Sequence, residues 1–339
     1  MNVPLPEISV SAKTPRNKLV VRGLDISPPI ALAPMVGLSH SALRTLVQEQ
    51  GGVGLLYTEM LAARRLPHDN ANCSPLLIRS AGEKPLFYQL VAASDQYIRA
   101  AVEKLHRLGA QGVDLNLGCP APILKKQGAG ISLADDDEQL RKVLRALRKN
   151  TELPVSVKIR LGERIDIGKS RKFCRFLQDE GVDLITIHAR LNGEKFCRKP
   201  RWAVIGEIKD AVSVPLFANG GIFTVEDARK CLELSCADGL MIGRGAGENP
   251  NLCAEIAAAV YGGTIGKPGR KGDIYFKFIR LLEERFAPER QLGRLKQFTS
   301  YFAAPFPFGH QLAAAIQTSN SIDQARQRAA DFFAANDSI

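Results

Sequence analysis

A cysteine with potential chemistry follows one short apolar stretch of the sequence. Residues 112–120 read Gly-Val-Asp-Leu-Asn-Leu-Gly-Cys-Pro, an alternating run that breaks at glycine and proline. Such a run predicts a buried strand that leaves its sheet. Asn116 and Cys119 then lie close to the carboxyl end of the strand, where barrels of parallel strands place their chemistry. The Cys119 thiol is therefore a candidate acid, base or nucleophile.

Polar residues on other apolar strands point to the same rim. Lys158 shares a strand face with Ser156 and Arg160. A lysine inside a barrel needs an anion or an acceptor, because burying an unpaired charge is costly. Gln89 and His188 lie toward the ends of two further strands. Each alone fits equally well a strand cap or a packed histidine, but together with the thiol they converge on one candidate site.

Two glycine turns suggest where a phosphate would bind. Asn219-Gly220-Gly221 and Gly243-Arg244-Gly245 follow the seventh and eighth predicted strands. The loops after these strands form the usual phosphate site of a barrel with eight strands, and Arg244 adds a positive charge. Two ordinary strand-ending turns are the alternative. The occurrence of both turns at the expected strands favours the phosphate site.

The elements that must position these residues alternate regularly. Strands are predicted at 30–35, 55–59, 86–90, 113–117, 154–160, 183–188, 214–221 and 238–245. Helical spacing follows at 39–50, with Ser39 as N-cap, and at 95–108, 136–149, 169–179, 202–211, 225–234 and from residue 250. Eight strand–helix units, whose strands are almost continuously apolar, follow one another. They predict an α/β fold, a (β/α)8 TIM barrel.

The barrel is predicted to be followed by a small all-α domain. Glycines and a proline between 262 and 269 form a linker, after which 274–286, 292–302 and 322–333 have helical spacing. We therefore expect a loose N-terminal arm over 1–20, a catalytic barrel over 21–261 and a helical domain over 262–339.

Composition indicates the compartment and the partner. No apolar run approaches the roughly 20 residues that span a bilayer, and we expect no secretory signal at the N-terminus. The seven cysteines show no metal-ligand spacing, so we expect no metal, and free thiols fit a reducing cytoplasm. The formal net charge of +11 favours an anionic partner, and RNA is favoured over a membrane. The alternative is a basic enzyme that has no such partner.

Six sequence blocks, taken in order, resemble the signature blocks of the flavin-dependent tRNA-dihydrouridine synthases. They are Ala33–Gly37, Gln89-Leu90, Asp114–Pro120, Val157–Arg160, Ala218–Gly220 and Ile242–Gly245. The match covers about residues 30–255, and the helical tail also fits the family. Residues 294–298 resemble a basic segment of the RNA-binding domain in bacterial members.

The resemblance implies a role for each matching residue. Cys119 would be the general acid and Asn116 would orient the uracil, while Arg294 and Lys296 would contact RNA. The FMN ring would lie along Pro34, Met35 and Val36, with Gln89 and Lys158 at its edge. His188 would hold the flavin or its phosphate side, and the FMN phosphate would be bound by Asn219, Gly220, Gly221, Gly243 and Arg244.

The implied reaction is the reduction of uridine to 5,6-dihydrouridine in tRNA. NADPH would reduce FMN, hydride would pass to uracil C6, and Cys119 would protonate C5. A thiol suits that step because an ordinary cysteine, with a pKa of about 8.5, is protonated yet able to give up its proton. The uracil must leave its stack, which costs a few kcal/mol, and phosphate contacts of the basic surface would supply this energy. The resemblance implies tRNA as the partner, and we expect a monomer.

Two departures leave other substrates open. Family members commonly read His-Gly-Arg-Thr where this chain has His188-Ala189-Arg190-Leu191, and an acidic residue often stands at Gly221. A basic loop over 195–200 either touches RNA or is solvated. The alternatives are a synthase acting on another RNA, a small-molecule flavin reductase of the dihydroorotate-dehydrogenase type, and a catalytically silent RNA-binding barrel. The modified uridine and the preference for NADPH over NADH are not readable from the sequence.

Overall fold

The structure, a computed structural model, describes residues 16–71, 73–264, 266 and 269–336. The predicted arm over 1–20 lies mostly outside these residues. Its last described residues enter strand β1 (Leu19–Val21), which pairs antiparallel with β2 (Leu24–Ile26). This hairpin was not predicted. Val21 and Ile26 pack onto the apolar residues inside the barrel, so the hairpin belongs to the barrel core.

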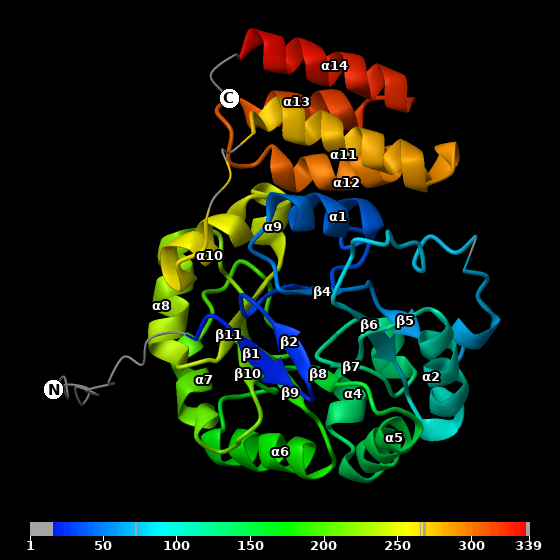
Figure 1. The fold of residues 1–339 in the computed structure, drawn as a ribbon, viewed down its shortest axis with the longest axis vertical. Coiled ribbons are helices and arrows are strands. Elements are labelled where there is room, and N and C mark those ends of the chain that lie inside the picture. The colour runs from blue at the N-terminus through cyan, green and yellow to red at the C-terminus, as the bar shows by residue number, and fades with distance from the viewer. Residues whose placement is uncertain (1–15, 72, 265, 267–268, 337–339) are drawn as a thin grey trace, which may run out of the picture.

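The eight predicted strands form a closed parallel barrel (Figure 1). The described sheet has the order β4-β3-β11-β10-β9-β8-β7-β6-β5, and pairing of β4 with β6 closes it. The strands are β3 (Ile30–Leu32), β4 (Leu55–Tyr57), β5 (Leu61–Ala62), β6 (Leu86–Val91), β7 (Gly112–Leu117), β8 (Val155–Arg160), β9 (Leu184–His188), β10 (Leu216–Asn219) and β11 (Gly239–Ile242). The predicted (β/α)8 barrel is confirmed.

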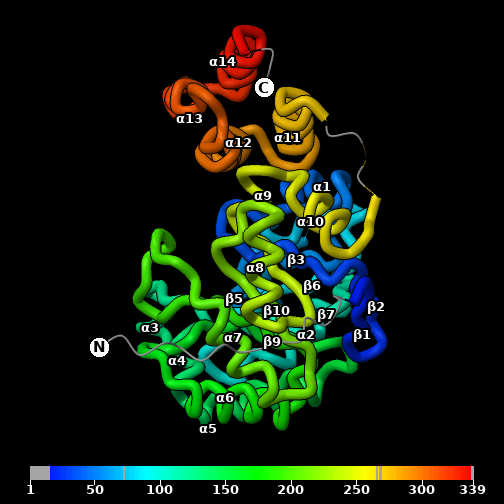
Figure 2. The backbone as a smooth tube through the Cα atoms, turned by 90° about the vertical axis from the view of Figure 1, so that its left-hand side faces the viewer, coloured from blue at the N-terminus to red at the C-terminus, as the bar shows by residue number. Residues whose placement is uncertain are grey.

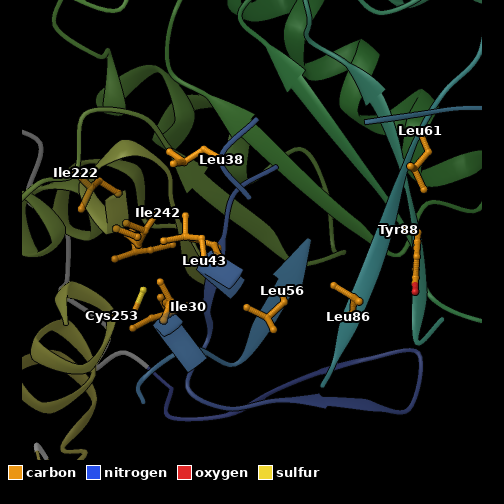
Figure 3. Packing of buried hydrophobic residues seen from close by; sticks show 14 of the residues in the cluster. Ile30, Leu38, Leu43, Leu56, Leu61, Leu86, Tyr88, Ile222, Ile242 and Cys253 are labelled. Atoms are coloured by element: carbon orange, nitrogen blue, oxygen red, sulfur yellow. The ribbon is translucent and has the colours of Figure 1, made fainter. Parts of the chain in front are cut away.

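Helices surround the barrel and cover the outer face of its strands. The longer ones are α1 (Ser41–Gln50), α2 (Ile98–Arg107), α5 (Asp137–Asn150), α6 (Ile167–Asp179), α7 (Trp202–Lys209), α8 (Val225–Ser235) and α10 (Leu252–Tyr261). Short turns of helix are η1 (Leu66–His68), η2 (Asp95–Tyr97), α3 (Pro122–Lys126), α4 (Ile131–Ala134) and α9 (Arg244–Glu248). Figure 3 shows side chains of both layers in contact, among them Ile30 of β3 and Cys253 of α10.

Local sequence explains how several of these helices begin. Thr224 accepts a hydrogen bond from the backbone N–H of Asp227, whose carboxylate accepts one from the Thr224 N–H in return. This capping box starts α8. Ser39 does not cap α1 as predicted, because His40 takes the N-cap position. The Ser39 hydroxyl instead accepts from Met35 N at 2.7 Å and so fixes the turn after β3.

Four helices at the C-terminal end of the chain pack beside the barrel, against α1 and α9 (Figures 1 and 2). They are α11 (Lys271–Arg285), α12 (Gln291–Phe302), α13 (Gly309–Gln317) and α14 (Ile322–Ala335), with the turn η3 (Pro288–Arg290) before α12. The sequence predicted three of them and missed α13. Phe278 and Phe298 stack at 3.8 Å between centroids and belong to the same apolar cluster as the barrel helices. The helical region therefore shares one core with the barrel.

Buried ion pairs reinforce this junction. Glu83, which is fully buried, accepts from Arg44 Nε of α1 at 2.6 Å and pairs with Arg285 of α11 at 3.2 Å. A buried carboxylate is tolerated only when it is paired and hydrogen-bonded. Two guanidinium groups from different parts of the chain meet that need, so the orientation of the helical region is tied to the barrel.

Candidate active site

The predicted site residues come together at one cavity of about 360 Å³ at the carboxyl ends of the strands. Its lining includes thirteen of the fifteen candidates: Pro34, Met35, Val36, Gln89, Asn116, Cys119, Lys158, His188, Asn219, Gly220, Gly221, Gly243 and Arg244. A larger cavity of about 790 Å³ lies beside α6 and is lined by none of them. Convergence of these residue types, rather than size, identifies the candidate site.

Close contacts explain why two glycines follow strand β10. Gly220 has a φ of +109°, and a Cβ at this position would lie 2.5 Å from Cδ2 of His188. Gly221 has a φ of +70°, and its Cβ would lie 2.8 Å from Cγ of Pro200. Only glycine fits such a conformation and such contacts. The turn therefore leaves its backbone accessible to the cavity.

Cationic side chains gather on the same side of the cavity. The Arg244 guanidinium lies 4.9 Å from the ring centroid of Phe196 and donates to its carbonyl at 3.3 Å. Arg190 donates to the same carbonyl at 3.1 Å and to that of Arg198 at 2.8 Å. The loop after β9 is thus held over two guanidinium groups. Burial, followed by the charges of neighbouring lysine and arginine side chains, lowers the pKa of His188 far below its ordinary value, so its ring is neutral.

Lys158 of β8 places a single amine at the wall of the cavity. Its side chain is half-buried and lines the cavity, and among the described residues its Nζ makes no hydrogen bond or ion pair. Burial lowers the pKa of Lys158 to about 8, while the Asp114 carboxylate raises it. The amine is therefore cationic at neutral pH and open to an anion or an electron-rich ring edge.

The loop that carries Cys119 is held by Asn116. Asn116 Oδ1 accepts from the backbone N–H of Cys119 at 3.0 Å and of Gly118 at 3.2 Å. On the other side, Ile131 N donates to the Cys119 carbonyl at 3.3 Å, and a Cβ at Gly130 would lie 2.6 Å from that oxygen. The thiol is half-buried at the cavity wall. Its backbone is fixed from both sides.

These features fit a flavin mononucleotide. The cavity volume lies within the roughly 300–1,000 Å³ that small-molecule and cofactor sites occupy. Glycine turns with Arg190 and Arg244 suit a phosphate. At the other side, Gln89 and the partner-free amine of Lys158 suit the polar edge of a ring. The donor set therefore matches an anion at one end and a heteroaromatic ring at the other.

Comparison with known proteins supports this interpretation. Residues 31–337 match the family described as "Dihydrouridine synthase (Dus)". The chain belongs to the dihydrouridine synthase family. It is 30% identical to a tRNA-dihydrouridine(16) synthase of Aquipseudomonas alcaligenes, over 88% of this chain and 98% of that one. It is 29% identical to a probable tRNA-dihydrouridine synthase 1 of Synechocystis sp., over 91% and 87% respectively.

A solved structure supports the fold alone. This dihydrouridine synthase is similar to a variant of NCR from Zymomonas mobilis, with a TM-score of 0.51 and 14% identity. The likeness covers 75% of this chain and 93% of the other. At such identity it bears on architecture and not on activity.

The two predicted RNA-contacting residues lie outside the cavity of the synthase. The guanidinium of Arg294 lies 4.3 Å from the Phe286 ring centroid and donates to the Arg290 carbonyl at 2.8 Å. Lys296 is half-buried on the same helix, α12. Their role toward RNA stays a prediction.

Other residues line the cavity that the sequence reasoning did not single out. Gln297 and Tyr301 of α12 reach it from the helical region, and Gln297 Nε2 donates to the Val36 carbonyl at 3.0 Å. Gly37 has a φ of +74°, and a Cβ there would lie 2.3 Å from Gln297 Oε1. Phe196 and Arg190 also line the cavity. The helical spacing over 292–302 and the basic segment over 294–298 predicted α12, but not which of its turns faces the barrel.

The remaining chemistry of the described residues is limited. The seven cysteines are free, and burial raises the pKa of Cys174 and Cys253, each to about 12. In the part of the chain that the structure covers, no three His, Cys, Asp or Glu side chains are grouped to hold a metal ion. No described helix has both the length and the apolar character that a membrane span requires.

Proposed function

We propose that this synthase reduces uridine to 5,6-dihydrouridine in tRNA, with FMN as its flavin and NADPH as reductant. The observation that carries the proposal is the placement of Cys119 and Lys158 on one cavity with the two glycine turns. The names of two relatives, given above, support tRNA as the RNA. The cavity character supports the flavin.

The residues on the phosphate side would hold the cofactor. Gly220, Gly221 and Gly243 leave room for a phosphate group, and Arg244 supplies charge. Asn219 donates to the Met241 carbonyl at 2.7 Å, which fixes the turn that precedes the glycines. Neutral His188 offers a ring N–H. The Pro34–Val36 segment would lie along the ring.

The residues at the other end would act on the uracil. When FMN is bound and reduced, hydride for C6 of the pyrimidine would come from the flavin. Cys119 holds its proton at Sγ and delivers it to C5, which completes the saturated ring. Lys158 stabilises negative charge at the ring edge through its ammonium group. Asn116 keeps the backbone of the thiol loop in place and orients the base.

The partner and compartment follow from charge and thiols. A net charge of +11 suits the phosphate backbone of tRNA. Arg294 and Lys296 of the helical region are the proposed RNA contacts. Because the described cysteines are free, we propose that the synthase works in the cytoplasm. We propose that it is a monomer, without a metal cofactor.

Two experiments test this function. Purified protein should carry FMN, seen in its visible absorption, and should form dihydrouridine on an unmodified tRNA transcript when NADPH is added. Dihydrouridine mapping on total RNA from cells with and without the gene identifies the modified position. Dihydrouridine that depends on the gene but lies in another RNA would identify that RNA as the substrate in place of tRNA. Colourless protein that takes up no FMN contradicts the proposal, and reduction of small orotate-like molecules alone favours the small-molecule alternative.

A further inference from the structure

A chain of side-chain hydrogen bonds links the barrel interior to the thiol loop. Gln89 on β6, Asp114 on β7 and Ser156 on β8 stand at matching register positions. Ser156 Oγ donates to Asp114 Oδ1 at 2.5 Å, and Gln89 Nε2 donates to Asp114 Oδ2 at 2.6 Å. Asn116 Nδ2 then donates to Gln89 Oε1 at 2.9 Å. The same Asn116 holds the backbone of Cys119 through Oδ1.

Every bond in this chain runs in the one direction that the Asp114 carboxylate allows. A carboxylate only accepts hydrogen bonds, so Gln89 must turn its NH₂ toward Asp114. Its Oε1 then faces Asn116, which must present its own NH₂ in return. Only the Oδ1 of Asn116 remains for the backbone N–H groups of the loop. Because the two ends of an amide have nearly the same shape, packing alone does not select this orientation.

We propose that Asp114 is a positioning residue that fixes the orientation of the Gln89 and Asn116 amides and thereby holds the loop that carries Cys119. Only the proton-donating role of Cys119 in this assignment rests on the proposed function. The chain of hydrogen bonds itself does not depend on which reaction the synthase performs.

The energetic cost of this carboxylate supports a functional role. Asp114 is fully buried, and none of the ion pairs among the described residues includes it. Burying a carboxylate is unfavourable unless hydrogen bonds compensate. Burial raises the pKa of Asp114 to about 6, while the hydrogen bonds from Gln89 and Ser156 and the charge of Lys158 lower it. A neutral residue of the same shape would avoid this cost, but it would not be restricted to accepting hydrogen bonds as a carboxylate is.

A change of one atom tests this argument. In Asp114→Asn the new amide can donate as well as accept, so Gln89 is no longer forced into one orientation. In the full chain as purified, without RNA or NADPH, we expect amide hydrogen exchange at Gly118 and Cys119 to become at least about tenfold faster than in the wild type. Unchanged exchange at these two amides would overturn the proposal.

A compensating double variant separates orientation from packing. In Asp114→Asn/Gln89→Glu the carboxylate moves to position 89, where it accepts from the new amide at position 114 on one side and from Asn116 on the other. Charge and size are conserved, and Asn116 again presents Oδ1 to the loop. We expect exchange at Cys119 to return to within about threefold of the wild-type rate. If Cys119 exchanges no more slowly in the double variant than in Asp114→Asn, the proposed role of Asp114 in orienting the amides is contradicted.

Ser156→Ala is the matched control. It removes the other hydrogen bond to Asp114 but leaves the carboxylate as an acceptor toward Gln89. Exchange at Gly118 and Cys119 should then stay within about twofold of the wild type. An increase equal to that of Asp114→Asn would show that any loss of contact at Asp114 loosens the loop, which contradicts a role in orientation.

A measurement on the unchanged protein holds even if a variant fails to fold. In a neutron structure, two deuterons should lie on the Gln89 atom that faces Asp114 and two on the Asn116 atom that faces Gln89. The opposite placement at either amide overturns the proposal. Since none of these readouts measures turnover, a failure of the proposed uridine reduction would leave them unaffected.

Discussion

Arg190 Nη1 lies 3.0 Å from Nε2 of His188, and this contact decides which ring nitrogen carries the proton. A guanidinium only donates, so Nε2 must accept and Nδ1 must bear the hydrogen. His188 therefore offers one N–H donor, and it does so without charge. Burial, followed by the charges of the neighbouring lysine and arginine side chains, lowers the pKa of His188 and keeps its ring neutral throughout the usual working range.

The first prediction concerns this donor. His188→Asn can place an NH₂ near the position of Nδ1, whereas His188→Gln reaches toward Nε2 instead. We expect His188→Asn to bind FMN more tightly than His188→Gln, which should lose on the order of tenfold or more in affinity with the hydrogen bond. Titration of flavin fluorescence measures both. FMN affinity of the wild type should show no titration of His188 between about pH 5 and 8, and a step near the ordinary histidine pKa of about 6.5 would contradict its neutrality.

The second prediction concerns the charge of Lys158. Burial lowers its pKa to about 8, so the amine is charged below that pH and becomes neutral above it. Uridine reduction should therefore fall as pH rises through about 8. Lys158→Met should lose on the order of 100-fold in turnover, as when one electrostatic donor of an active site is removed. The part of the fall near pH 8 that belongs to the lysine should be absent from its pH profile. An unchanged fall in Lys158→Met would assign it to another group.

The third prediction separates the thiol from the flavin chemistry. Cys119→Ala should keep its yellow colour and still oxidise NADPH, because the cavity residues around the flavin are unchanged. It should form dihydrouridine more slowly by about 10²–10⁴, the usual contribution of a general acid. Cys73→Ala, at an exposed cysteine, is the control and should match the wild type. Unchanged product from Cys119→Ala would remove this residue as the acid.

The fourth prediction follows from the cost of burying Asp114. Its pKa rises from 3.8 to about 6 on folding, so between these values the folded protein binds more protons than the unfolded one. The stabilising contribution is complete below pH 3.8 and is lost as pH rises through about 6. Asp114→Asn avoids this loss and should raise the free energy of unfolding at about pH 7, by up to about 3 kcal/mol.

Urea unfolding at about pH 7 and about pH 5 measures this effect. The gain of Asp114→Asn over the wild type should be smaller at the lower pH, where the native carboxyl is largely protonated. A variant that is less stable at neutral pH than the wild type would show that the ionised carboxylate stabilises the fold. Greater stability combined with a looser thiol loop would mark Asp114 as a group retained for function.

The sequence was sufficient for the barrel because each strand and helix carries its own periodic signal. Strand β7 was predicted from Val113 to Leu117 and begins one residue earlier, at Gly112. The cavity lining could also be predicted, since carboxyl ends of parallel strands meet at one rim. By contrast, α13 (Gly309–Gln317) was missed. Leu312 and Ile316 are the large apolar residues among its nine, with alanines between them, so its apolar face is short.

Contacts between distant segments were beyond sequence reasoning. Nothing local shows that Gln297 of α12 would meet the Val36 carbonyl, 261 positions earlier. The orientation of the Gln89 amide likewise depends on a carboxylate of another strand. Ser39 looked like a helix cap because serine often takes that position, yet its hydroxyl bonds the turn at Met35. Such choices depend on tertiary packing, which propensity does not describe.

The last prediction distinguishes the two basic residues of α12. Arg294 stacks on Phe286 and bonds a backbone carbonyl, so Arg294→Ala should lower the free energy of unfolding by about 1 kcal/mol. Lys296 has no side-chain hydrogen bond or ion pair among the described residues. Lys296→Ala should therefore weaken tRNA binding at unchanged stability and reduce the salt slope of log K by about 1. If affinity and slope both stay the same, Lys296 touches no phosphate, and the RNA surface must lie elsewhere on the helical region.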